Sequence, residues 1–351
     1  LPGIVCYKNL YTLSGDSIHF QFQVNVTSSY MPTIGGSSEP NFFGNVHARK
    51  AFAYALDFDA LIADAWLGEA EHLATWHIAG LFPDFRDPSI VPYNLDRDMV
   101  VYHFKNANFS GGSLWDTGFH TYLLYNTGNP RRRAACEMIE SVIEGLNEGR
   151  EPERLFIIDV IGLDWSVFIS EFYARNLPCS QIGWLADFAD ADNLVRPYMH
   201  SLGDFSYNQG YKNVTVDAEI DWAAETDNET LRRELYYDLQ QTFINECPSV
   251  MTVQPYARFW LRNWVHGWYY NPLDIFNPFG DFYSMWKSPT STRYDWSMFR
   301  HDLRHTGYSE SPAPNTNQTI WNYTTGAALS FSSPAVADGK VYVGSNDMKV
   351  Y

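Results

Sequence analysis

Three aspartates gather within six positions in the stretch GWLADFADADN, residues 183–193. They are Asp187, Asp190 and Asp192, and the aromatic residues Trp184 and Phe188 stand among them. Carboxylates this close together can bind a metal ion, act as general acid and base, or hold a positively charged group. They can also sit in a solvated loop that caps the following helix. The spacing alone leaves all four interpretations open.

The metal and catalytic interpretations make demands that can be compared with the sequence. A calcium loop of the EF type needs acids at positions 1, 3 and 5, Gly at 6 and Glu at 12. Here the acids stand at 187, 190 and 192, and Asn193 comes next, so the match is poor. A glycosidase needs two carboxylates a few ångströms apart, a distance that no sequence gives. A hydrolase that uses Asp187 with Asp190 or Asp192 therefore stays an alternative.

A second candidate is HDLRH, residues 301–305. His301 and His305 would share one face of a helix and could hold zinc. A zinc protease needs Glu after the first His, whereas Asp302 stands there and is one methylene shorter. Pro and Gly flank the segment, and no apolar helical face surrounds it. We interpret it as a polar lead-in to a β segment, and we predict neither a metal nor a cofactor.

From residue 121 onward, apolar runs typical of strands alternate with runs typical of helices. The predicted strands are 121–126, 155–163, 179–185 and 250–257, and the predicted helices are 130–147, 164–176 and 228–246. This alternation is typical of an α/β domain with a mainly parallel sheet. The run LFIIDVIGL favours a buried strand. The aspartates follow the carboxyl end of strand 179–185, where such sheets bind ligands.

The helix starts and the earlier part of the chain add further expectations. Pro130 suits the first turn of its helix, and Asp164 and Asp57 are predicted caps. The alternating run IHFQFQVNV predicts a strand over 18–26, and a helical pattern follows from Val46. Residues 77–118 are predicted to be mostly loop, with a short helix near 95–105.

A third candidate set consists of amide and aromatic residues in, at the end of, or just after predicted strands. Its members are Gln21, Phe22, Tyr125, Asn126 and Trp165. Core packing is the alternative, and it is strongest for Phe22.

Composition limits the classes of function. The net charge of −17 makes nucleic acid an unlikely partner, because an acidic surface repels phosphate. No apolar run of about 18 residues occurs, so no membrane span is predicted. The four cysteines Cys6, Cys136, Cys179 and Cys247 form no CxxC, and one or two disulfides are open. Six N-x-S/T sequons favour a secreted protein weakly; they begin at Asn25, Asn108, Asn213, Asn228, Asn317 and Asn322.

Composition changes near residue 286, and the rest of the chain is turn-rich. IWNYTTG and SSPAVADGKVYVGSNDMKVY predict short strands with Asp-Gly and Asn-Asp turns. This all-β segment of about 56 residues is too short to bury a core alone. The chain starts at Leu1 and stops inside a predicted strand, so we expect a piece of a longer protein.

Several stretches, taken in order, resemble one family over residues 1–285. They are HARKAFAYALDFDALI, LLYNTGN, LDWSVFISEF, GWLADFADADN and LYYDLQQTFINECPSV with VQPYARFWLRNWVHGW. They resemble the extracytoplasmic solute-binding proteins of ABC importers for oligopeptides, dipeptides, nickel or oligosaccharides (solute-binding family 5).

The resemblance implies a type II periplasmic-binding-protein clamshell of α/β lobes, present here as an incomplete clamshell, mainly the second large lobe. It implies capture of oligopeptides or oligosaccharides by lobe closure, outside the membrane, by a periplasmic, extracellular or surface-anchored protein. The implied partners are an ABC permease and its ATPase, and no enzymatic reaction is implied.

The resemblance also implies ligand contacts from this lobe. The Asp of the GWxAD motif, here Asp187, binds the amino terminus of a peptide in peptide-binding members. Trp184 lines the cleft, Trp165 opens a helix beside it, and Asn126 follows a strand. The strand before HARKAF places Gln21 or Phe22 near the ligand backbone. Some members hold a peptide carboxylate with Arg two residues before the motif, but Gln181 stands here, which puts capture of short peptides by their carboxylate in doubt.

The tail resembles a second family. DWSMFRHDLRHTGYSESPAPNTNQTIWNYTTG and SSPAVADGKVYVGSNDMKVY look like the lead-in and first blade of a PQQ-like β-propeller over 296–351, after a linker at 286–295. The resemblance implies repeats of about 40 residues, without implying the quinone. Two further functions stay open: a secreted enzyme, such as a PQQ-type dehydrogenase, and a structural cell-surface protein.

Overall fold

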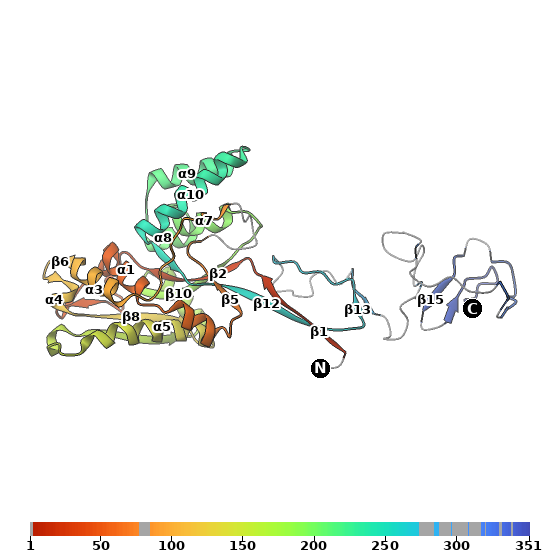
Figure 1. The fold of residues 1–351 in the computed structure, drawn as a ribbon, viewed down its shortest axis with the longest axis horizontal. Helices are drawn as coiled ribbons and strands as arrows, with labels where there is room; N and C mark the ends of the chain where they lie inside the picture. The colour runs from red at the N-terminus through yellow and green to blue at the C-terminus, as the bar shows by residue number, and fades with distance from the viewer. Residues whose placement is uncertain are drawn as a thin grey trace. The chain divides into compact units, whose positions relative to one another are not determined.

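The computed structural model describes residues 3–76, 85–273, 284–287, 296, 308, 317–319, 321–329, 332–337 and 340–351. These residues form two compact units, one of Lys8–Ala257 and one of Leu1–Tyr7 with Arg258–Tyr351. Figure 1 labels their elements. The first unit contains the predicted α/β alternation, and it is the unit that carries the candidate aspartates.

A mixed sheet of seven strands forms the centre of the first unit. Its strands are β2 (Ser14–Phe20), β3 (Thr33–Ile34), β4 (Ser37–Ser38), β8 (Phe119–Asn126), β9 (Phe156–Leu163), β10 (Cys179–Leu185) and β11 (Ser249–Met251). They follow the order β11-β2-β10-β8-β3-β4, and β9 pairs with β8. A smaller sheet has the order β1-β12-β5, with β1 at Ile4–Tyr11, β12 at Val253–Arg262 and β5 at Ala70–His72.

The prediction of a mainly parallel sheet was wrong. Strand β8 runs parallel to β9 and β10, but β2, β3, β4 and β11 all pair antiparallel. The strand-helix-strand rule fixes direction only where a helical crossover joins neighbouring parallel strands. Here α5 joins β8 to β9 and α6 joins β9 to β10. Strand β2 precedes these crossovers, so they do not constrain its direction.

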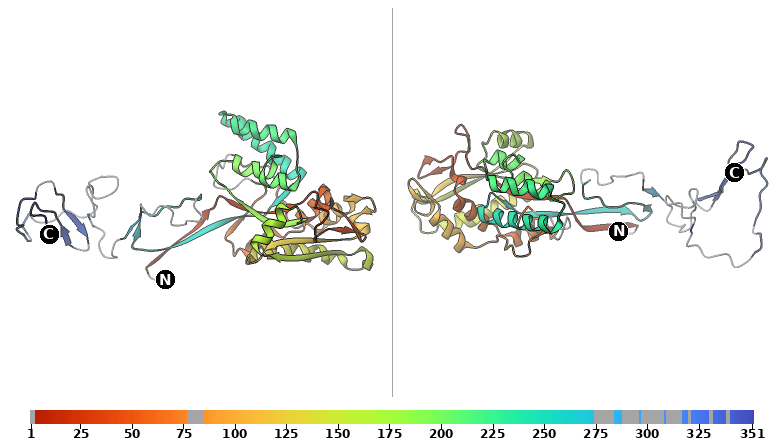
Figure 2. Two further views of the ribbon diagram at one scale, coloured as in Figure 1. Left: turned by 180° about the vertical axis from the view of Figure 1, so that it is seen from behind. Right: turned by 90° about the horizontal axis from the view of Figure 1, so that it is seen from above.

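Helices pack on both faces of the sheet (Figures 1 and 2). The longer ones are α1 (Val46–Tyr54), α3 (Arg97–Asn106), α5 (Pro130–Glu144), α6 (Trp165–Tyr173), α7 (Asp192–Met199), α9 (Val214–Glu225) and α10 (Glu229–Glu246). The shorter ones are α2 (Phe58–Ala60), α4 (Leu114–Thr117), α8 (Asp204–Gln209), the π-helical turn Leu61–Ala65 and the 3-10 turns Phe42–Gly44, Gly145–Asn147 and Pro152–Arg154. A small hairpin joins β6 (Asn108–Phe109) to β7 (Gly112–Ser113).

Two hydrophobic cores lie on opposite faces of the sheet, because successive strand residues point to opposite sides. Leu123 belongs to the first core and Leu124 to the second. Val250 and Met251 divide in the same way. Helices α1, α3 and α5 contribute to the first core, and α6 to α10 to the second.

Most predicted elements are confirmed, with three corrections. The strand predicted over 18–26 ends at Phe20. The strand predicted over 250–257 is divided between β11 and β12, which belong to different sheets. Strand β9 is half-exposed rather than buried, because within the described sheet it pairs with β8 alone.

The predicted helix starts also occur. The Asp57 carboxylate accepts from the Ala60 amide, and Pro130 is the first residue of α5. Asp164 occupies the cap position of α6 but makes no capping bond. Its carboxylate instead accepts from the Thr127 hydroxyl at 2.7 Å, which ties the loop after β8 to the loop after β9.

The cysteines form no disulfide in this structure: Cys6, Cys136, Cys179 and Cys247 all carry free thiols. Three of them are buried, and burial raises the pKa of the Cys136 thiol. They therefore behave as small apolar core residues.

The second unit contains short strands in its described part. Strand β13 (Val265–His266) pairs with β14 (Trp286–Lys287), and β15 (Ala335–Ala337) pairs with β16 (Lys340–Tyr342). A turn forms at Asn346–Asp347 as predicted, but residues 321–326 of the predicted IWNYTTG strand are irregular. HDLRH lies outside the described residues. The predicted boundaries 1–285, 286–295 and 296–351 stay predictions.

A buried arginine joins α1 to the end of α10. The Arg49 guanidinium donates to four main-chain carbonyls: Phe43 at 2.7 Å, Gly44 at 3.0 Å, Glu246 at 2.8 Å and Cys247 at 2.8 Å. We expect Arg49→Lys to lower the free energy of unfolding by about 2 kcal/mol, because an ammonium cannot reach carbonyls on both sides and leaves some unpaired.

Urea unfolding followed by circular dichroism measures this effect. The matched control is Arg133→Lys, since Arg133 is exposed and pairs with Glu137 one helical turn away. That change should alter stability by less than about 0.5 kcal/mol. Equal effects of the two substitutions would contradict a structural role for the Arg49 fork.

Candidate functional site

Four of the six predicted site residues meet at one edge of the sheet. Strands β8, β9 and β10 are parallel, so their carboxyl ends lie at the same edge. Asn126 is the last residue of β8 and pairs with Leu163, two residues before Trp165. Trp184 lies near the end of β10, and Asp187 follows it. We call this edge, with Asn126, Trp165, Trp184 and Asp187, the acidic edge.

The structure does not bring Gln21 and Phe22 to the acidic edge. Because β2 is antiparallel to β10, its last residue, Phe20, pairs with Cys179 at the opposite end of β10. The Gln21 side chain is buried and donates to the carbonyls of Gln23, Asn208 and Gln209. The Arg49 guanidinium lies 4.2 Å from the centre of the Phe22 ring, which packs against both cores.

The loop after β10 holds Asp187 by its backbone. The Asp187 amide donates to Oδ1 of Asn193 at 2.9 Å, and the Trp184 indole N–H donates to the same oxygen at 3.1 Å. Asn193 is buried, whereas Asp187 is exposed. Among the described residues the Asp187 carboxylate has no hydrogen-bond or ionic partner. It is therefore available to a ligand cation.

The other two aspartates of the cluster have partners within the fold. Asp190 pairs with Arg232 at 2.7 Å, and Asp192 pairs with Arg196 at 2.9 Å, one helical turn away. The N-cap residue of α7, Ala191, gives no side-chain bond, but the Asp190 carboxylate accepts from the amide of Asp192, the first residue of α7, at 2.8 Å, so Asp190 takes part in capping the helix. The pair of Asp190 with Arg232 anchors the acid-rich loop to α10, whereas the pair of Asp192 with Arg196 lies within α7.

The two tryptophans of the acidic edge are exposed to different degrees. Trp184 is half-buried, and its ring meets Phe205 edge to face with 5.5 Å between ring centres. Trp165 is 53% exposed and stacks on Phe168 with 5.8 Å between ring centres. Trp165 thus offers a flat apolar surface whose underside is fixed by a core residue, an arrangement suited to apolar side chains or sugar rings.

An arginine that the sequence analysis did not select organises the acidic edge. Arg132, in the first turn of α5, donates to Asp16 at 2.6 Å and to Oδ1 of Asn126 at 2.9 Å. Oδ1 of Asn126 is thus occupied, and its Nδ2 donates one N–H to the Thr127 carbonyl at 3.4 Å, which leaves the second N–H of Nδ2 for a ligand. A Cβ at Gly183 would lie 2.4 Å from Asp16 Oδ1, so this network requires the glycine of the GWxAD motif. The signal in the sequence was an arginine in the first turn of a helix that follows a strand end.

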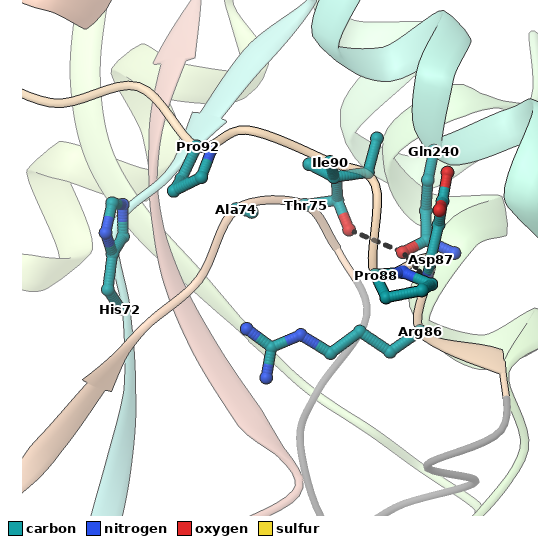
Figure 3. Close-up of a pocket in the computed structure, with 9 residues that line it drawn as sticks. All are labelled: His72, Ala74, Thr75, Arg86, Asp87, Pro88, Ile90, Pro92 and Gln240. Atoms are coloured by element: carbon teal, nitrogen blue, oxygen red, sulfur yellow. Dashed lines mark hydrogen bonds between the residues drawn. The ribbon is translucent and has the colours of Figure 1, made fainter.

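A pocket of about 490 Å³ lies beside β5 and α10 (Figure 3). Its lining residues are His72, Ala74, Thr75, Arg86, Asp87, Pro88, Ile90, Pro92 and Gln240. Gln240 accepts from the Thr75 hydroxyl and the Asp87 amide, and Arg86 pairs with Glu71. Burial lowers the pKa of His72 to about 4, so its ring is neutral at pH 7. Most polar groups here therefore serve the fold.

The described ranges hold no group of three or more His, Cys, Asp or Glu side chains placed to bind a metal ion. Within the same ranges, no helix is both long enough and apolar enough to cross a bilayer.

The sheet with helices on both faces and polar groups at the carboxyl edge defines an α/β lobe of the periplasmic-binding-protein type. Residues 8–206 match the family described as bacterial extracellular solute-binding proteins, family 5 Middle. The chain belongs to this family of extracellular solute-binding proteins.

Comparison with single proteins agrees with this assignment. The oligopeptide-binding protein OppA of Bacillus subtilis is 23% identical over 230 residues, which are 65% of this chain and 40% of that protein. The heme-binding protein A of Haemophilus influenzae is 23% identical over 218 residues, 62% of this chain and 38% of that protein. The chain thus spans about two fifths of the length of these curated relatives.

Solved structures share the fold. The periplasmic binding protein DppA of Helicobacter pylori, in complex with the peptide STSA, has a TM-score of 0.60 at 17% identity, over 82% of this chain and 49% of that one. The oligopeptide-binding protein AppA of Bacillus subtilis, in complex with a nonapeptide, has a TM-score of 0.62 at 15% identity, over 82% of this chain and 53% of that one.

Proposed function

We propose that this lobe forms one side of the binding cleft of an oligopeptide receptor that serves an ABC importer. The observation that carries the proposal is the exposed Asp187 carboxylate, which is held at the carboxyl edge of the sheet without a partner among the described residues. An ammonium group is the natural ligand for such a carboxylate, because the hydrogen bond between them is charge-assisted. The names of OppA and of the peptide complexes among the similar structures support the same ligand class.

The acidic edge would recognise a peptide through three kinds of contact. Asp187 accepts from the amino terminus, and the Asn126 amide donates to a ligand carbonyl. Trp165 and Trp184 pack against side chains without selecting among them. Gln21 and Phe22, predicted as further contacts, would act from the far end of β10 only through the fold. The ligand shifts the open–closed equilibrium towards the closed state because it bridges both lobes there.

The proposed partners and location follow from this function. The receptor would deliver its ligand to an ABC permease and its ATPase, which lie in and on the membrane. It would work outside the membrane as a periplasmic, secreted or surface-anchored protein. Its role is capture without chemical turnover.

Oligosaccharides are the second candidate ligand. The observation that favours them is the flat, half-exposed ring of Trp165, since indole faces also stack on sugar rings. In that case Asp187 would accept from sugar hydroxyls.

The ligand class can be measured directly. The full-length protein is purified without refolding, denatured, and the released small molecules are analysed by mass spectrometry. Peptides of mixed sequence support the proposal, and oligosaccharides reassign the site to the second candidate. An empty protein that binds neither class in calorimetry would overturn both.

Trp165 provides a prediction about affinity. We expect Trp165→Ala to weaken ligand binding by about tenfold, roughly 1.4 kcal/mol, because the ligand loses an aromatic wall. The melting temperature should hardly change, since half of the ring is already exposed. Isothermal titration calorimetry measures the affinity and differential scanning fluorimetry the stability.

The chain offers a matched control for this prediction. Trp222 is also 53% exposed, and it belongs to α9, a helix that packs mainly against α7 and α10. Trp222→Ala removes the same surface and should leave the affinity unchanged. A loss of affinity in both variants would show that the effect is general rather than local.

We further propose that the tail begins a β-propeller of the PQQ-like type. The hairpin of β15 and β16 and the following bridge Gly344↔Val350 support a blade-like arrangement of short strands. A hollow of about 640 Å³ beside them is lined largely by apolar residues, including Trp321 and Tyr323. Small-angle scattering of the full-length protein tests for a propeller-sized second body.

A further inference from the structure

Two of the six sequons occupy equivalent places in the fold. Asn213 begins Asn-Val-Thr and caps α9, and Asn228 begins Asn-Glu-Thr and caps α10. In each case the side-chain Oδ1 accepts from the second and third amides that follow, those of Thr215 and Val216 or of Thr230 and Leu231. The two asparagines therefore share a local conformation, and a difference between them must come from the surroundings.

The surroundings differ at the amide nitrogen. Nδ2 of Asn213 donates to Glu246 Oε1 at 3.0 Å, and the Tyr211 hydroxyl donates to the other oxygen of the same carboxylate. Asn213 is half-buried by these contacts. Asn228 is exposed, and its Nδ2 has no partner among the described residues. It lies in the short turn between α9 and α10, a helix pair on the outer side of α7 and α8 (Figures 1 and 2).

The other two sequons of the first unit have engaged amide nitrogens. Asn25 and Asn108 are exposed, but their Nδ2 atoms donate to the carbonyls of Ala174 at 3.3 Å and Asn106 at 3.2 Å. Asn228 is thus the sequon of the first unit whose nitrogen is both exposed and unengaged. The chain belongs to a family of extracellular proteins, so sugar-transfer enzymes that face away from the cytoplasm can reach Asn228.

We propose that Asn228 carries an N-linked glycan in the folded protein and that Asn213 does not. The donor is an oligosaccharide joined through phosphate to a membrane lipid. Nδ2 forms a bond to the anomeric carbon, the bond from that carbon to the phosphate oxygen breaks, and the lipid phosphate leaves. Nδ2 gives up one proton and keeps the other. Oδ1 is not consumed, so Asn228 can still cap α10 after the transfer.

The surroundings of Nδ2 make the modification structurally neutral at Asn228 and costly at Asn213. A sugar on Asn228 would extend from an exposed turn into solvent. A sugar on Asn213 would replace one amide hydrogen beside Glu246 and crowd the contact with Tyr211. Both sequons end in Thr, so the motif itself does not distinguish them. The fraction of molecules that carry a glycan should nevertheless be higher at Asn228 than at Asn213.

The test is peptide-level mass spectrometry of the full-length protein purified from the cells that naturally make it. We expect the peptide that contains Asn228 to carry a sugar mass and the peptide that contains Asn213 to have its unmodified mass. An unmodified Asn228, or equal occupancy at both sites, would overturn the proposal.

Variants expressed in the same cells separate modification from folding. Thr230→Ala destroys the sequon but leaves Asn228 as the cap, and it should lower the intact mass by one glycan. Thr230→Ser keeps the sequon and should keep the glycan. Thr215→Ala is the matched change at the Asn213 sequon. The intact mass should change only by the difference between Thr and Ala, because no glycan is lost. The proposal fails if Thr230→Ala retains the glycan mass, and ligand affinity should be the same in all three variants.

Discussion

Asp187→Asn should weaken the binding of free-amino peptides to the full-length receptor by about 100-fold, or roughly 2.8 kcal/mol. The substitution keeps the size and hydrogen-bonding shape of the side chain but removes the charge that faces the ligand ammonium. Since the Asp187 amide, rather than its carboxylate, is bonded to Asn193, the loop should keep its conformation. Isothermal titration calorimetry measures the affinity, and the melting temperature should stay constant.

Peptide chemistry makes this test specific. Acetylation of the peptide amino terminus removes the ammonium from the other side of the pair. The wild-type protein should lose affinity for the acetylated peptide, whereas Asp187→Asn should bind both forms alike. Glu148→Gln serves as the control for net charge, because Glu148 is exposed and lies before β9, away from the acidic edge. If Asp187→Asn still distinguished the two peptides, the ammonium would be bound elsewhere.

The second large effect concerns stability in acid. We expect the free energy of unfolding to fall by about 3 kcal/mol between pH 6.5 and pH 4 on account of His19 alone. Burial lowers the pKa of His19 to about 3. Its ring packs against Phe172 and Phe205, and neither of its nitrogens has a hydrogen-bond partner among the described residues. Above pH 6.5 the ring is neutral in both states. Between pH 6.5 and 3 the unfolded chain binds a proton that the folded chain excludes, so stability decreases as the pH falls.

Substitution of His19 should flatten this pH dependence. His19→Leu removes the titrating group and two unpaired nitrogens, so stability at pH 7 should be unchanged or higher. Part of the slope should remain, since burial also lowers the pKa values of His72 and His103 to about 4. Urea titrations at intervals from pH 4 to pH 7 measure the slope. His120→Gln is the control, because the His120 ring is only half-buried and pairs with Asp159. An unchanged slope in His19→Leu would show that another group governs acid stability.

The sequence predicted much of the α/β lobe, because the helices predicted over 130–147, 164–176 and 228–246 and most strands have local signals, whereas α7, α8 and α9 were not predicted. Pro130 marked a helix start, and the run before Asp164 marked a strand. Strand direction could not be predicted in the same way. Strand β2 runs antiparallel because it pairs with β10, which is distant in the chain. The hydrophobic periodicity of a strand carries no information about the direction of its partner.

The same limit explains the outcome for the site. Asn126 and Trp184 lie at the carboxyl ends of parallel strands, and Trp165 and Asp187 follow such ends, so topology alone places them at one edge. Gln21 and Phe22 were expected near the ligand because the family resemblance places the strand before HARKAF there, and the sequence does not show that β2 runs antiparallel to β10. The partners of individual side chains also stayed beyond the sequence. Whether Asp187, Asp190 or Asp192 is free depends on arginines in three-dimensional contact.

The way the loop after β10 is held has a consequence for how such receptors can diversify. One buried oxygen, Oδ1 of Asn193, accepts from both the Asp187 amide and the Trp184 indole. The Asp187 side chain takes no part in these bonds. Natural variation at this single position can therefore exchange a carboxylate for a neutral or basic group without rebuilding the backbone around it. Under the proposed function, one substitution at position 187 would change the charge of the solute that this lobe accepts, while Asn193, Arg132 and Gly183 remain as they are.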